Sequence, residues 1–428
     1  MISLLNLKKP AAFALIAVAL FVFADKLVVK TVMQRERSYI DFTSYYVAAY
    51  ELRHGNSPYA TLEIGENFIR NNVPSEDMLD MGINFPVPEK FAYTYPPLLA
   101  LLLSPLTFLP YGTALYIWWA VNLLLLGGVI LAVLSMLKET RFGLMLGMVL
   151  LLFLASMPSF ETFSLGQVNY LVLLLCLLAF IFDRKGKILI SAFMLAAASF
   201  IKITPAVLLL YFIFFSKGKR YFFWYLGFCA GFFAVCAFSA GTANFIHYLT
   251  FILPKLSGSY LLDNNKSLIS LVSRVFKANP MVNPLMLSNT AAAISTAVIA
   301  LGLTLFAALR LKAASSLEGE ENKLKAFSLA LLLMLLIQTL LEIHHLIYAF
   351  LPLCVFALYG KQKPALKGVL LALLLLMLNT RGWNAMEVSG RAWWVIFLTA
   401  PQVWGLILLF ILIFGSFSAK RSLNGVIR

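Results

Sequence analysis

The chain has 428 residues, of which 61% are hydrophobic and 12% charged, and its formal net charge is +15. Because soluble chains carry about 25% charged residues, this composition excludes an ordinary soluble domain and indicates a polytopic membrane protein. The basic residues lie in short clusters between apolar segments. This pattern is typical of the positive-inside rule, so we expect membrane lipids and no nucleic acid among the partners.

The apolar segments predict an all-α transmembrane fold with about twelve spans, because each helix must satisfy its own backbone within the bilayer. The segments lie near residues 10–30, 113–137, 143–158, 168–182, 187–201, 205–216, 221–241, 289–311, 325–342, 346–360, 367–380 and 393–415. With both termini in the cytoplasm, every basic cluster then falls on the cytoplasmic side. The clusters occupy residues 138–141, 183–187, 216–220, 310–325, 361–367 and 420–428.

The proline-rich segment Pro97–Pro110, PLLALLLSPLTFLP, is then either re-entrant or a short helix that continues into the next span, because prolines interrupt helices. Counting it as a full span gives the alternative of thirteen spans. We predict one integral-membrane domain over residues 1–428, with long outer loops at 31–96 and 242–287.

The first outer loop contains SYIDFTSYYVAAYELRHGNSPY, residues 38–59. Asp41 stands at a possible N-cap, Phe42–His54 is amphipathic, and Gly55 follows where a C-cap would fall. Spanning a bilayer needs roughly 20 residues, so this segment predicts an interfacial helix. Asp41 is either a helix cap or a functional carboxylate.

The sequence contains no βαβ alternation, no glycine-rich nucleotide loop and no P-loop. A nucleotide-activated substrate would need such a feature in any familiar nucleotide-binding fold. We therefore expect neither a nucleotide-activated donor nor a cofactor.

Lys202, in ASFIKITPA, stands at the outer end of a hydrophobic helix before a proline. A charge in the bilayer core costs at least about 2.5–3.5 kcal/mol, so an intramembrane lysine usually has a function and an anionic partner. The partner could be Asp41, Glu161 or a ligand phosphate. Alternatively, the side chain reaches the lipid headgroups.

A second group of polar residues lies in NNKSLISLVSRV, where Asn265, Lys266 and Arg274 could bring two cations and an amide toward one anion. The alternative is an interfacial helix with a polar cap. In SLGQVNY, Gln167 and Asn169 open an apolar helix, which suits a phosphate or a sugar hydroxyl and equally suits ordinary capping.

The paired histidines His344 and His345, beside Glu342, could supply a base or a hydroxyl-binding group, or could simply pack. Neighbouring helical residues point to different faces, which argues against a two-histidine metal site, and we predict no metal. Tyr95 belongs to an aromatic set near the expected interfaces, which forms an aromatic belt or stacks on sugar rings.

Several of these segments together resemble glycosyltransferase family 87, within the GT-C class of membrane glycosyltransferases. The resemblance rests on the acidic residue and YYVAAYELRHGNSPY of the first loop, FAYTYPPLLALLLSPLTFLP, SLGQVNYLVLLLCLLAF, AAASFIKITPAVLLLY, NNKSLISLVSRV and the paired histidines. It departs from the family before the histidines, where QTLLEI stands in place of a segment like SPISW, and at Lys266, where an amide is expected.

This resemblance implies a hexosyltransferase that moves a sugar, with mannose expected, from a polyprenyl-phosphate donor to an extracytoplasmic glycolipid or glycan of the cell envelope. It implies that Asp41 acts as general base with inversion, with His344 or His345 as a rival base. Lys202, Arg274 and Lys266 would bind the donor phosphate. The residues implied to orient the substrates are Tyr95, Gln167, Asn169 and Asn265.

Two other functions compete with this one on the sequence alone. A transporter or flippase of a lipid-linked sugar would also have many helices and charges at cavity ends, but no inverted repeat is visible. A structural subunit of an envelope-assembly complex would tolerate neutral substitutions at Asp41 and Lys202.

Overall fold

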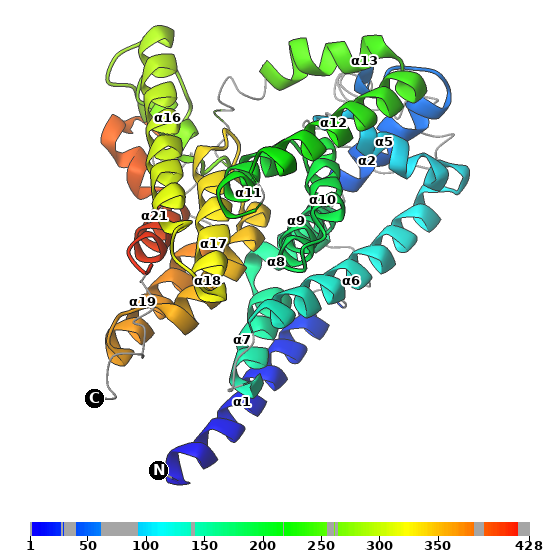
Figure 1. Ribbon diagram of the computed structural model, residues 1–428. Coiled ribbons are helices and arrows are strands. Elements are labelled where there is room, and N and C mark those ends of the chain that lie inside the picture. The colour runs from blue at the N-terminus through cyan, green and yellow to red at the C-terminus, as the bar shows by residue number, and fades with distance from the viewer. Residues whose placement is uncertain are drawn as a thin grey trace. The chain divides into compact units, whose positions relative to one another are not determined.

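The computed structural model describes residues 2–26, 29, 40–60, 93–137, 142–216, 218–254, 261, 264–380 and 389–417 (Figure 1). Across these ranges the secondary structure is helical apart from one parallel pairing of two residues each, β1 (Val282–Asn283) with β2 (Arg391–Ala392). This confirms the expected all-α class. The chain forms two compact units: unit 1 comprises residues 1–206 and 223–258, and unit 2 comprises 207–222 and 259–428.

Within the described ranges, three helices are long and apolar enough to cross a membrane by themselves: α6 (Tyr111–Met136), α12 (Lys219–Ala240) and α16 (Asn289–Ala314). The pair α7 (Phe142–Ala155) and α8 (Met157–Ser164), bent by 45°, makes a fourth if it forms one span. The other predicted spans that are described fall on shorter helices.

Unit 1 is built around the antiparallel neighbours α9 and α10, with α6 packed on α9 and α1 packed on α7 (Figure 1). Chain segments 61–92 and 138–141 lie outside the described residues, so most of the predicted first loop is not covered. Besides the helices already given, and most of α12, its elements are α1 (Ile2–Val22), α2 (Ile40–Arg53), η2 (Pro58–Ala60), α5 (Pro97–Leu103), η3 (Ser104–Phe108), α9 (Asn169–Arg184), α10 (Ile188–Ile201), the start of η4 (Thr204–Leu208), α13 (Thr242–His247) and η5 (Tyr248–Ile252).

Unit 2 is built around α17, which packs against α16, α18 and α21. The predicted loop 242–287 lacks description at 255–260, 262 and 263, and the basic cluster 420–428 lies outside the described residues. Besides α16, β1 and β2, its elements are α11 (Leu209–Phe215), α15 (Leu268–Arg274), α17 (Glu320–Ile337), η6 (Ile343–Ala349), α18 (Phe350–Tyr359), α19 (Pro364–Asn379), η7 (Trp393–Leu398) and α21 (Pro401–Phe414).

The segment Pro97–Pro110 forms two short helices, α5 and η3, and then leads into α6. Pro97 starts α5, where its missing N–H costs nothing, and Pro110 takes the N-cap position of α6. The segment is therefore helical and leads directly into α6, while its path relative to the membrane stays a prediction. α5 packs against α2 and α10.

The segment Pro158–Gln167, between the predicted spans 143–158 and 168–182, is mostly the helix α8. Ser156 caps it by accepting a hydrogen bond from the Ser159 N–H at 3.4 Å, and Pro158 occupies the first turn, where proline is tolerated. Only residues 165–168 lie between α8 and α9.

Three basic side chains bind backbone carbonyls at the C-terminal end of α21. Arg310, Lys325 and Lys361 donate to three carbonyl oxygens within residues 414–417, at 3.1, 2.9 and 2.7 Å. The last carbonyls of a helix lack partners within the helix and carry partial negative charge, so cations stabilise them. These side chains come from the basic clusters 310–325 and 361–367, which the predicted topology assigns to one face of the membrane. Side chains of both clusters therefore meet at this end of α21.

Candidate active site

Asp41 lies in the first turn of α2, which is held against the turn after α8. The Phe42 N–H donates to the Leu165 carbonyl at 3.2 Å. Gly166 has a φ of +69°, and a Cβ there would lie 2.6 Å from the Phe42 Cβ. Trp118 donates from Nε1 to the Gly166 carbonyl at 2.7 Å. Only glycine combines this backbone conformation with this close approach, so Gly166 allows α2 to dock.

Gln167 is the centre of the polar cluster in unit 1. Its Oε1 lies 3.1 Å from the Tyr45 hydroxyl and 3.2 Å from the Tyr95 hydroxyl, and the two hydroxyls lie 3.0 Å apart. The Gln167 side chain is also hydrogen-bonded to Asp41. Because Oε1 accepts from the tyrosines and an ionised carboxylate only accepts, the Gln167 amide nitrogen is the donor to Asp41.

The environment of Asp41 holds it near the pH range of a general base. Burial raises the pKa of the Asp41 carboxyl from 3.8 to about 6. The hydrogen bond from Gln167 and the positive charge of Lys202 lower the pKa, while the negative charge of Glu161 raises it. Burial outweighs the two lowering effects because it penalises the charged form directly.

Lys202 belongs to the same cluster. Its Nζ donates to Asn169 Oδ1 at 2.9 Å and lies 5.7 Å from the centre of the Tyr95 ring. Lys202 occupies the C-cap of α10 with extended backbone, and Asn169 is the first residue of α9. Asp41, one of the partners expected for Lys202, is close enough for the lysine charge to lower its pKa. Asn169 is a hydrogen-bond partner of Lys202 that the sequence did not predict.

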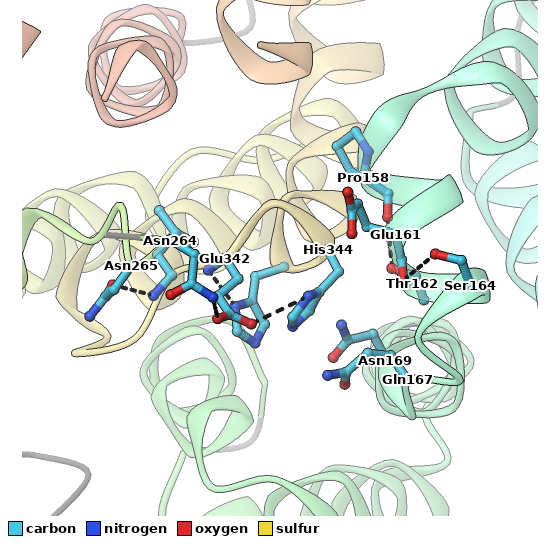
Figure 2. A network of polar contacts seen from close by, with 12 residues as sticks. Pro158, Glu161, Thr162, Ser164, Gln167, Asn169, Asn264, Asn265, Glu342 and His344 are labelled. Atoms are coloured by element: carbon cyan, nitrogen blue, oxygen red, sulfur yellow. Dashed lines mark hydrogen bonds and ion pairs between the residues drawn. The ribbon is translucent and has the colours of Figure 1, made fainter. Parts of the chain in front are cut away.

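Neither Gln167 nor Asn169 serves as the ordinary helix cap that the sequence allowed. The N-cap of α9 is Val168, and no side chain caps it. Figure 2 shows both amide side chains close to one another at this helix start, near Thr162 and Glu161 of α8. The polar side chains at the start of α9 are therefore directed to other side chains.

Tyr45 is the residue that the sequence analysis missed. Its ring meets Tyr95 edge-on, with centroids 5.1 Å apart, and it is completely buried. The signal was available, since Tyr45 follows Asp41 by four residues and so shares its face of α2. Tyr93 supports the neighbouring segment by donating to the Pro96 carbonyl at 2.7 Å and accepting from the Ala100 N–H at 3.0 Å.

In unit 2, Asn265 and Ser267 hold the loop before α15 against the chain that follows α17. Asn265 Nδ2 donates to the Thr339 carbonyl at 2.8 Å, and its Oδ1 accepts from the N–H groups of Leu341 and Ser267 at 3.0 Å each. Ser267 donates to the same Thr339 carbonyl at 2.8 Å and caps α15. The polar cap expected as an alternative for this motif is therefore present.

The two predicted cations of unit 2 are both buried. Lys266 is 4% exposed and its backbone N–H donates to the Leu341 carbonyl at 2.8 Å, while Arg274, in the last turn of α15, is fully buried. Both side chains therefore face the protein interior and not lipid. A charge buried there needs compensation by other charges or by hydrogen bonds.

The paired histidines lie in the first turn of η6 and contact each other, with ring centroids 4.3 Å apart. His344 Nδ1 lies 3.7 Å from Glu342 Oε2, and the Glu342 backbone N–H donates to His345 Nδ1 at 3.0 Å. Asn264 Nδ2 donates to the Glu342 carboxylate. In Figure 2, Glu342 lies between Asn264 and His344 and is joined to both by dashed lines.

Comparison with known proteins gives one family and two relatives. The model of glycosyltransferase family 87 matches residues 93–339. A polyprenol-phosphate-mannose-dependent alpha-(1-2)-phosphatidylinositol pentamannoside mannosyltransferase of Mycolicibacterium smegmatis is 28% identical over 333 residues, which cover 76% of this chain and 72% of that protein. The protein of the same description from Mycobacterium tuberculosis is 29% identical over 138 residues, 31% of this chain and 30% of that protein.

Proposed function

The chain belongs to glycosyltransferase family 87, and we propose that it transfers mannose from a polyprenyl-phosphate donor to an extracytoplasmic glycolipid or glycan, with inversion at the anomeric carbon. The donor is supported by the two relatives, whose names state polyprenol-phosphate-mannose dependence. Membership of a glycosyltransferase family also favours transfer over the transport of a lipid-linked sugar.

The observation that carries the proposal is the surrounding of Asp41. Its carboxylate receives a hydrogen bond from Gln167, lies near the charge of Lys202, and has a pKa of about 6. At pH 7 such a group is mostly ionised yet basic enough to accept a proton, which is what general base catalysis requires.

In the proposed reaction, the acceptor hydroxyl oxygen attacks the anomeric carbon from the side opposite the phosphate. The new C–O bond forms as the bond to the phosphate oxygen breaks, and the hydroxyl proton passes to Asp41. The polyprenyl phosphate leaves with the bonding electrons, so the configuration inverts. No other proton acceptor is required, although His344 or His345 remains the rival base.

Cations would stabilise the departing phosphate, because negative charge develops there in the transition state. Lys202 is suited to this role since its Nζ is already held by Asn169 at 2.9 Å. Arg274 and Lys266 are the candidates in unit 2.

Tyr95, Gln167 and Asn169 would orient the donor or the acceptor through their hydroxyl and amide groups. Asn265 would act indirectly, by holding the loop 264–267 through its three bonds to backbone groups.

We further propose that one domain, residues 1–428, crosses the membrane about twelve times, with both termini in the cytoplasm. Loops 31–96 and 242–287 would then lie outside, where the donor phosphate is presented. The common position of Arg310, Lys325 and Lys361 at one end of α21 supports this topology, because all three would lie on the cytoplasmic side.

The test is transfer by purified protein in lipid, using radiolabelled polyprenyl-phosphate-mannose and a cell-envelope lipid extract. We expect a new labelled product with the wild type and none with Asp41→Asn, because the amide cannot accept the proton. The matched control is Asp183→Asn, in the basic cluster at the end of α9. Equal turnover by Asp41→Asn would refute the role of Asp41, and movement of labelled donor without any new glycosidic bond would refute the transferase.

A further inference from the structure

Tyr45 is fully buried in α2, one helical turn after Asp41, and its hydroxyl belongs to a group of three oxygen atoms. The other two are the Tyr95 hydroxyl, 3.0 Å away, and Gln167 Oε1, 3.1 Å away, and these two lie 3.2 Å from each other. The Val168 N–H is also hydrogen-bonded to the Tyr45 hydroxyl. Tyr45 therefore contacts the residue that is hydrogen-bonded to Asp41.

The two tyrosine hydroxyls are placed to donate to the Gln167 amide oxygen. An amide oxygen has two lone pairs, so Oε1 can accept from both. The Tyr45 oxygen already accepts from the Val168 N–H, so the group that it offers to Gln167 is its proton. These contacts favour the orientation of the amide in which its oxygen faces the tyrosines.

The rest of Gln167 is held by its backbone. The Gln167 N–H donates to the Thr162 carbonyl at 2.9 Å, and the side chain is 2% exposed. Rotation of the terminal amide by a half turn would exchange its oxygen and its nitrogen. The oxygen would then face the Asp41 carboxylate, and two acceptors facing each other disfavour the charged form.

We propose that Tyr45 is a positioning residue: together with Tyr95 it holds the Gln167 amide oxygen, keeps the amide nitrogen on Asp41, and so keeps the carboxylate available as a proton acceptor. Its role in sugar transfer rests on the proposed glycosyltransferase function, in which Asp41 is the base. The orientation of Gln167 does not depend on that function.

Other titratable side chains face Asp41 or pack on α2 from neighbouring elements. The charge of Lys202, at the end of α10, lowers the pKa of the Asp41 carboxyl, and the charge of Glu161 in α8 raises it. Further titratable side chains of α2 and of the elements packed on it include Tyr46, Tyr50, Glu51, Arg53, Tyr59 and Tyr111. Removal of the Tyr45 hydroxyl leaves all of these groups in the chain.

The test is Tyr45→Phe, which removes the hydroxyl and keeps the ring that meets Tyr95 edge-on at 5.1 Å. The matched control is Tyr46→Phe, at the next residue of α2. Tyr46 is 2% exposed, and its hydroxyl donates to the Leu109 carbonyl at 2.7 Å. Each variant removes one buried hydroxyl and one bond to a backbone group, but only Tyr45→Phe removes a contact to Gln167.

The measurement is the titration of Asp41 by carbon NMR of protein labelled at the aspartate carboxyl group, in lipid bilayers and without substrate. Asp41→Asn assigns the signal. Because the hydrogen bond from Gln167 lowers the pKa of the Asp41 carboxyl, weakening this bond should raise the midpoint. We expect a rise of about half a unit to one unit in Tyr45→Phe, and of about one to two units in Gln167→Leu, which removes the bond. Tyr46→Phe should keep the wild-type midpoint.

A double variant shows whether Tyr45 acts through Gln167. The amide is absent in Gln167→Leu, so Tyr45→Phe should produce no further shift in that background. In the transfer assay, Tyr45→Phe should lose about two- to fivefold more activity at pH 6 than at pH 8, because its ionised fraction of Asp41 falls most near the midpoint. A purely structural loss would be the same at both pH values.

An unchanged midpoint in folded Tyr45→Phe protein would overturn the proposal, as would an equal shift in Tyr46→Phe or a shift that persists in the Gln167→Leu background. If Tyr45→Phe does not fold, Tyr95→Phe takes its place, because it removes the other hydroxyl from Gln167 and should shift the midpoint in the same direction. No shift in Tyr95→Phe would then overturn the proposal. If the wild type makes no mannosylated product, the proposed function fails, while the titration still decides the role of Tyr45.

Discussion

The polar cluster around Asp41 in unit 1 and the loop 264–267 in unit 2 are held in different ways. In unit 1, Gln167 bonds two tyrosine hydroxyls and a carboxylate, so side chains bind side chains. In unit 2, Asn265 and Ser267 bond mostly backbone groups of residues 339–341. The first arrangement shifts the pKa of the Asp41 carboxyl, whereas the second holds a loop in place.

This difference predicts that substitutions in the two clusters fail in different ways. Removing a side chain from the Asp41 cluster should alter chemistry or pH dependence in a folded protein. Removing a side chain from the loop of unit 2 should lower stability first, because a backbone group loses its partner in a buried place.

The largest of these effects is expected for Gln167→Leu. The change removes the hydrogen bond that orients Asp41, while the hydroxyls of Tyr45 and Tyr95 can still bond each other. Misplacing a catalytic group by about 1 Å can cost roughly 100-fold in rate, so we expect a loss of about that size in kcat. Gln402→Leu, which removes a buried hydrogen bond to the Thr380 carbonyl in unit 2, is the control. Equal losses of kcat in both variants would contradict a special role of Gln167 in orienting Asp41.

A smaller effect should appear in the pH dependence of transfer. The base form of Asp41 is lost as the pH falls through about 6, so kcat/KM should drop about tenfold per unit below that value. Lys202→Met removes a charge that lowers this pKa and should move the acidic limb of the pH profile, where kcat/KM falls, to higher pH. It should also raise the KM for the donor. Glu161→Gln removes a charge that raises the pKa and should move the limb to lower pH.

The pH limb is measured from initial rates at saturating acceptor, with the fraction of folded protein checked at each pH. A limb that stays in place in both variants would mean that another group, such as a histidine, is the base.

The smallest effect on activity is expected for Asn265→Ala. The change leaves the Leu341 N–H and the Thr339 carbonyl without the Asn265 amide, which should cost about 1–3 kcal/mol of stability. The thermal unfolding midpoint in detergent should fall, while kcat/KM per folded molecule should change little. Asn379→Ala, which removes a bond to the Leu375 carbonyl within α19, provides the control. A large loss of activity at an unchanged midpoint would instead place Asn265 in contact with substrate.

Local features of the fold could be predicted because they depend on neighbours in the chain. Residue types at fixed offsets explain three of these features. They are the start of α5 at Pro97, the N-cap position of Pro110 before α6, and the start of α9 soon after Gly166. The helix α8 was not predicted as a separate element, because its N-cap Ser156 lies inside the predicted span 143–158.

The sequence alone determined the membrane class, most helix positions, the resemblance to the family and the short set of polar residues from which a site could be built. Only the tertiary structure decided which of them meet: Gln167 with Tyr45 across 122 positions, Lys202 with Asn169 across 33, and Asn264 with Glu342 across 78. The physical reason is that periodicity and capping act within one or two helical turns, whereas these pairings depend on how whole helices pack.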